Sequence, residues 1–90
     1  MSELQHIRQQ LQQNQLHLAL ESVNLALQAS PRDADLLFLR GKIYWRLGNR
    51  AAATASYAAA AALDPHSPAV NALENARDID NFFNPDIFNP

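Results

Sequence analysis

Few residues of this sequence could carry out chemistry, and their spacing does not assemble a catalytic site. The three histidines, His6, His17 and His66, are scattered, and no recognised metal-binding motif contains them. The chain has no Ser-His-acid set and no Gly-rich phosphate loop, because Gly41 and Gly48 stand alone. We therefore expect a protein that is not an enzyme and that binds neither a metal nor a cofactor.

The remaining candidate residues are of types that bind ligands without catalysis. Phe38 and Trp45 are seven residues apart, which places them on one face of a helix, and Lys42 and Arg46 belong to the same stretch. Aromatic rings beside cations suit a ligand with apolar and acidic groups. What these residues do depends on the elements that position them.

Length and composition set the outer limits. Ninety residues make at most one small domain, and 48% apolar content supports a core. A net charge of −2 argues against nucleic-acid binding by bulk charge, and the absence of cysteine excludes disulfides. No apolar run approaches the roughly 20 residues of a membrane span, and the polar N-terminus lacks a signal-peptide core. We expect a cytoplasmic protein whose partners are neither nucleic acid nor membrane.

Residues 34–65 predict two antiparallel helices joined by a short turn. The first helix has apolar residues on more than one face, which indicates neighbours on both sides. Gly48-Asn49 ends it and caps the second helix, which contains nine alanines and stops at Asp64-Pro65. Gly41, which has no Cβ, should let a neighbouring helix approach closely.

This unit resembles a tetratricopeptide repeat, a helix-turn-helix unit of about 34 residues. Arg40 departs from the family pattern, where a leucine is usual. The resemblance implies an all-α, right-handed stack of helix-turn-helix repeats, about five helices in all, with an irregular C-terminal tail. The positions that match the pattern are Leu37, Gly41, Tyr44, Ala53, Tyr57, Ala60 and Pro65.

A weaker copy precedes this unit. When residues 1–33 are aligned with the core unit by a shift of 34 positions, the second helices match: Ala19, Val23, Ala26 and Pro31 align with Ala53, Tyr57, Ala60 and Pro65. The first helices match poorly, because Ile7 and Gln10 align with Gly41 and Tyr44. We predict helices at residues 2–13, capped by Ser2, and at residues 15–29, capped by Asn14. Asp33 should cap the first helix of the core unit, and Ser67-Pro68 should open a last helix at residues 68–79. The predicted domain thus spans residues 1–79, as repeat one (1–33), repeat two (34–67) and a capping helix (68–79).

Residues 80–90, DNFFNPDIFNP, show no helical period and contain two Asn-Pro pairs. We predict a non-helical tail that is too rich in large apolar residues for a disordered segment. Its apolar side chains need a surface to bury against, and the tail motif consists of Phe82, Phe83, Ile87 and Phe88.

The family resemblance also implies that the first helix of each pair lines a concave peptide-binding groove. The groove residues it implies are Met1, Leu4, Arg8, Leu11 and Gln12 in the first repeat, Asp35, Phe38, Lys42, Trp45 and Arg46 in the second, and Ala69, Ala72, Ala76 and Ile79 in the last helix. In the alternative reading, Phe38 and Trp45 are ordinary core residues and Lys42 and Arg46 form a solvated face. The carboxylate clamp of some family members is absent, because Leu4 and Leu39 occupy two of its positions.

We predict a non-catalytic protein-protein interaction module whose groove binds an extended aromatic and acidic peptide of a protein partner. The tail of the chain has this composition and would be able to occupy the groove itself. The alternative is a structural, homo-oligomerising scaffold, with a homodimer as one form, in which the tail completes the core or serves as a motif for another protein.

Overall fold

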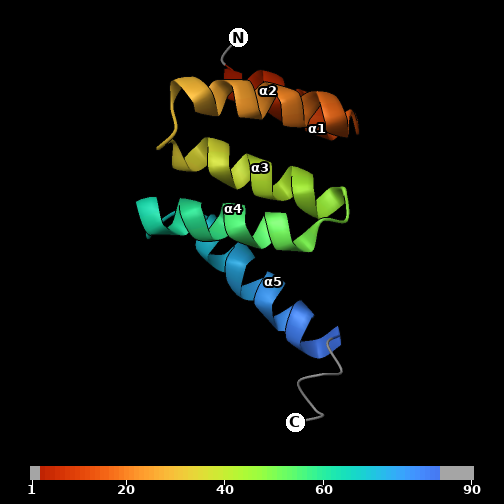
Figure 1. Cartoon of the computed structure of the whole chain (residues 1–90), viewed down its shortest axis with the longest axis vertical. Coiled ribbons are helices and arrows are strands. Elements are labelled where there is room, and N and C mark those ends of the chain that lie inside the picture. The colour runs from red at the N-terminus through yellow and green to blue at the C-terminus, as the bar shows by residue number, and fades with distance from the viewer. Residues whose placement is uncertain (1–2, 84–90) are drawn as a thin grey trace.

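The computed structural model describes the backbone of residues 3–83 and the side chains up to Ile79. Within this range all regular structure is helical. The helices lie roughly across the long axis of the molecule, with α1 behind α2 at one end and α5 leaving the stack obliquely at the other (Figure 1). The predicted all-α fold with five helices is confirmed. The helices are α1 (Glu3–Gln12), α2 (Leu16–Ala29), α3 (Ala34–Arg46), α4 (Arg50–Leu63) and α5 (Ala69–Phe83).

Three of the predicted helix starts are capped by the expected side chains. The Asp33 carboxylate accepts hydrogen bonds from the backbone N–H groups of Asp35 and Leu36, at 3.0 and 3.2 Å. The Asn49 side chain accepts from the N–H of Ala52 at 3.1 Å, at the start of α4. Ser67 accepts from the N–H of Ala69 at 3.1 Å, at the start of α5. Each cap satisfies a donor that has no partner inside its helix.

The prediction that Asn14 caps α2 is wrong. The residue before α2 is Gln15, which makes no side-chain capping bond. Asn14 instead has a left-handed backbone, with φ of 60°, and ends α1. Its N–H donates to the carbonyl of Leu11, and the N–H of Gln15 donates to that of Gln10, which is the Schellman pattern.

The second repeat ends its first helix in the same way. Gly48 has φ of 84°, its N–H donates to the Trp45 carbonyl, and the N–H of Asn49 donates to that of Tyr44. Gly48 lies 34 residues after Asn14, so the two left-handed residues occupy equivalent places in the two repeats. Asparagine can replace glycine here because it tolerates this backbone better than other residues do.

Helix α5 continues beyond the predicted end at residue 79 and stops at Phe83. The prediction of a non-helical tail from residue 80 is therefore wrong for residues 80–83. The apolar spacing of Ala76, Ile79 and Phe83 continues the helical stripe, and Asn84-Pro85 is the next helix-breaking signal. The tail-motif residues Ile87 and Phe88 and the cap residue Ser2 lie outside the described residues.

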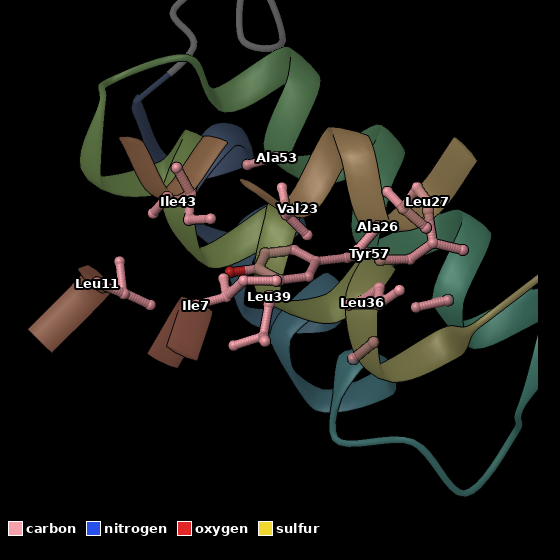
Figure 2. Packing of buried hydrophobic residues seen from close by; sticks show 14 residues of the cluster. Ile7, Leu11, Val23, Ala26, Leu27, Leu36, Leu39, Ile43, Ala53 and Tyr57 are labelled. Carbon is pink, nitrogen blue, oxygen red and sulfur yellow. The ribbon is translucent and has the colours of Figure 1, made fainter. Parts of the chain in front are cut away.

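The core is a single cluster of buried side chains from all five helices, in which Tyr57 of α4 extends among residues of α1, α2 and α3 (Figure 2). Gly41 makes room for that ring, because a Cβ at Gly41 would lie within 3.0 Å of three Tyr57 ring atoms. The first repeat has Ile7 and Val23 at the equivalent positions, both at most 1% exposed. Two branched aliphatic side chains of similar size thus take the place of the glycine and the aromatic ring.

Arg40, the departure from the family pattern, links three helices. Its Nε donates to the hydroxyl of Ser56 in α4 at 3.1 Å, and its Nη1 donates to Asn24 Oδ1 in α2 at 3.4 Å. Ser56 is 1% exposed, so this bond satisfies a hydroxyl that water does not reach. The long arginine side chain replaces apolar packing with polar links from α3 to its two neighbours.

Candidate functional site

The first candidate feature is a pocket of about 340 Å³ between α1 and α3, which we call the α1–α3 pocket. Cationic side chains from both helices line it, and no lining residue is acidic. This matters because the chain as a whole has a net charge of −2. The lining residues are Arg8, Leu11, Gln12, Phe38, Leu39, Lys42 and Arg46.

The periodicity of α3 sets this arrangement. Phe38, Lys42 and Arg46 are four residues apart in succession and therefore share one helix face. The Lys42 ammonium lies over the Phe38 ring, 5.5 Å from its centroid, so the aromatic face holds the cation beside the pocket. The rim of the pocket combines this ammonium with two guanidinium groups.

Arg46 also ties α3 to α1. Its Nη1 donates to the backbone carbonyl of Leu11 at 2.8 Å. That carbonyl lies in the last turn of α1 and also accepts the N–H of Asn14, so the guanidinium is its second donor. A guanidinium has five N–H donors, so this bond fixes the position of Arg46 while the group retains further donor capacity.

The second feature, the α3–α5 pocket, lies on the other side of α3 and has a volume of about 210 Å³. Its walls are mainly apolar, and the short side chains of α5 leave the space open. Trp45 forms part of the wall, and the Arg50 guanidinium lies 5.4 Å from the Trp45 ring centroid. The lining residues are Trp45, Tyr57, Ala72, Asn75, Ala76 and Ile79.

The two pockets adjoin through a pair of aromatic rings. Phe38 lines one pocket and Tyr57 lines the other, and their ring centroids are 5.9 Å apart with the planes tilted by 41°. Burial raises the pKa of the Tyr57 hydroxyl above its usual value near 10. The face of α1, α3 and α5 therefore offers a cationic pocket beside an apolar one.

Most residues of the predicted groove line one of these pockets. Arg8, Leu11, Phe38, Lys42 and Arg46 surround the α1–α3 pocket. Trp45 lines the α3–α5 pocket instead, together with three of the four residues named for the last helix, Ala72, Ala76 and Ile79.

Other predicted residues belong mainly to the core. Leu4 is half-buried against the core cluster and lines neither pocket, and Ala69 is buried. Leu11 is only 3% exposed, so little of it is available to a ligand. Phe38 and Trp45 are half-buried, pack against the core and also line the pockets, so their packing role is observed and their binding role stays a prediction.

Sequence reasoning missed four residues in or beside the pockets: Leu39, Tyr57, Asn75 and Arg50. Asn75 could have been found from its place on α5 between Ala72 and Ala76. Tyr57 was recognised only as a core residue of the repeat. Arg50 lies beyond the Gly48 turn, and no periodicity in the sequence places it over the ring of Trp45.

The described part of the chain lacks two other kinds of site. No group of three or more acidic or histidine side chains in it could hold a metal ion. None of its helices is both long and apolar enough to cross a membrane.

Comparison with known proteins identifies the core unit. Residues 34–67 match the family model of the tetratricopeptide repeat, which covers α3, α4 and the turn after them. No curated protein and no solved structure matches the chain significantly.

Proposed function

Residues 34–67 of this chain are a tetratricopeptide repeat, and on that premise we propose that the chain binds an extended segment of a partner protein across α1, α3 and α5. Repeats of this family generally mediate interactions between proteins and are typically non-catalytic. The proposed ligand is a peptide that carries acidic and aromatic side chains.

One observation carries the proposal: the cations of the α1–α3 pocket have no acidic counterpart among the lining residues. Three of the seven lysine and arginine residues of an acidic chain line this one pocket. Such a concentration favours an acidic partner and would speed its encounter with the face. The apolar α3–α5 pocket next to it suits an aromatic side chain.

Residues 84–90 of the chain itself, which follow α5, have this composition, with Asp86 beside Ile87 and Phe88. In the proposal this segment can also occupy the face, and a partner would then have to displace it. Tethering would give the segment a local concentration on the order of millimolar.

Selection of peptides against the full chain tests the proposal. The library would display random peptides of about twelve residues, long enough to cross both pockets. We expect the selected peptides to be rich in Asp, Glu, Phe, Tyr and Trp, and to shift the NMR signals of Trp45 and Lys42. We also expect Lys42→Glu to abolish their binding, whereas Arg32→Glu should leave it unchanged, because exposed Arg32 lines neither pocket. Binding that ignores Lys42→Glu, or shifts confined to α2 and α4, would contradict the proposal.

A second candidate function is self-association through α2. Leu18 and Leu25 are 50% and 65% exposed and lie seven residues apart on that helix. Two leucines on one exposed stripe favour pairing with a second copy of α2. Light scattering would show a dimer that becomes a monomer in Leu18→Gln/Leu25→Gln, and a monomeric wild-type chain would exclude this function.

A further inference from the structure

The two pockets flank a single helix, and this limits how a bound segment can be arranged. The α1–α3 pocket lies on one side of α3 and the α3–α5 pocket on the other. Phe38 and Tyr57, whose rings are in contact, connect them. A segment that uses both pockets must therefore cross α3.

We propose that the partner segment is recognised by a pair of side chains: an anionic group in the α1–α3 pocket and an aromatic ring in the α3–α5 pocket, roughly three to four residues apart. This inference rests on the proposed function and adds the spacing and the place of each side chain. The spacing follows from the helix packing, because clefts on either side of one helix lie about 10 Å apart and an extended chain advances about 3.3 Å per residue.

The anionic end is assigned by the donors of the α1–α3 pocket. Arg8 and Lys42 flank it from α1 and α3, and Arg46 is held in place by its bond to the Leu11 carbonyl. A guanidinium group binds a carboxylate or a phosphate through parallel N–H donors. The shared chemistry is an anionic oxygen group on a peptide side chain, which either Asp or Glu or a phosphorylated Ser supplies.

The aromatic end is assigned by the size and lining of the α3–α5 pocket. Its volume of about 210 Å³ exceeds the roughly 150 Å³ of an apolar cavity that accepts benzene. Ala72 and Ala76 leave the space open, and Trp45 and Tyr57 provide aromatic surface for an incoming ring. Asn75 adds an amide that could bond the polar atom of a Tyr or Trp ligand.

The test uses the full chain and synthetic peptides with one Asp and one Phe on a Gly-Ser background. The number of residues from Asp to Phe is varied from about one to seven, to bracket the spacing set by the helices. We expect the tightest binding at a separation of three or four, and at least about tenfold weaker binding when Asp is replaced by Asn. A parallel series with phosphoserine in place of Asp shows which anionic group is preferred.

Two variants test the anionic contact and the aromatic contact separately. Lys42→Gln should reduce the advantage of Asp over Asn, because only Arg8 and Arg46 then remain as cations, and should keep the preference for Phe. Ala72→Leu, which fills the α3–α5 pocket, should remove the preference for Phe and keep the advantage of Asp. Ala55→Leu is the matched control, because Ala55 is exposed on α4 and lines neither pocket. Lys42→Gln alters only a half-buried side chain at the pocket rim, so it decides the result even if Ala72→Leu fails to fold.

The outcomes separate this inference from the proposed function. Peptides that bind the face equally well at every spacing, or whose binding is indifferent to Lys42→Gln, overturn the paired recognition alone. If neither the spaced peptides nor the selected ones bind the face, the proposed function fails as well.

Discussion

Replacing Gly41 with alanine tests the packing that separates the two pockets. A Cβ at Gly41 would lie within 3.0 Å of three ring atoms of Tyr57, a ring that is 6% exposed and has little room to move. Overpacking of this kind costs about 1–3 kcal/mol, and the close approach of three atoms favours the upper end. Alanine gains about 1 kcal/mol over glycine in a helix interior. The net expectation is a loss of about 2 kcal/mol in the free energy of unfolding, or roughly 8–16 °C in Tm.

The first repeat supplies the control. It carries Val23 at the position equivalent to Tyr57, so Tyr57→Val removes the ring and leaves a residue that the fold already uses there. In this background Gly41→Ala meets no ring, and only the helix-propensity gain of about 1 kcal/mol remains. Gly41→Ala should therefore destabilise the wild-type chain and stabilise the Tyr57→Val variant.

The assay is urea denaturation followed by circular dichroism at equilibrium, applied to the four proteins of this double-mutant cycle. The expected coupling free energy between the two positions is about 3 kcal/mol. The same sign of effect in both backgrounds would refute the argument that Gly41 is needed for the approach of Tyr57. Since Tyr57 lines the α3–α5 pocket, Gly41→Ala should also weaken any ligand bound there.

Three further predictions concern stability and are checked by the same denaturation assay. Burial raises the pKa of Tyr57, so its contribution to stability is complete below about pH 10 and is lost as the pH rises through the folded-state pKa. The wild-type chain should lose more stability than Tyr57→Phe above about pH 10, and equal losses would contradict this. Gly48→Ala should lower the free energy of unfolding by about 1–2 kcal/mol, because φ at Gly48 is 84°. Asn14→Gly, at the equivalent left-handed position, should not destabilise the chain, and a destabilising effect would refute the equivalence. Asp33→Ala should lower the free energy of unfolding by about 1 kcal/mol, because two capping hydrogen bonds are lost. Asp33→Asn should lower it less, since asparagine also caps helices, and equal losses would rule out the cap as the cause.

The helix face that carries the candidate site was predictable, because it follows from spacing within one helix. Phe38, Lys42 and Trp45 share a face of α3 wherever that helix is placed. The division of this face into two pockets was not predictable. It depends on where α1 and α5 lie relative to α3, and on the ring contact between Phe38 and Tyr57.

Local signals explain which helix ends were predicted correctly. Asp33 and Asn49 act within a few residues of themselves, so sequence alone locates their caps. Asn14 was misassigned because asparagine serves equally well as an N-cap and as a left-handed C-terminal residue. Comparison with Gly48, 34 residues later, would have identified its role.

The amino-acid sequence was sufficient to predict the all-α repeat fold, the unit at residues 34–67 and the helix face that carries the aromatic and cationic residues. These properties depend on helical periodicity and on capping, which act over a few residues. The sequence did not predict that Tyr57 packs over Gly41, that Arg46 binds the Leu11 carbonyl or that Arg40 joins three helices. Those contacts link residues at least 16 positions apart, so they depend on distances between helices that local propensity does not encode.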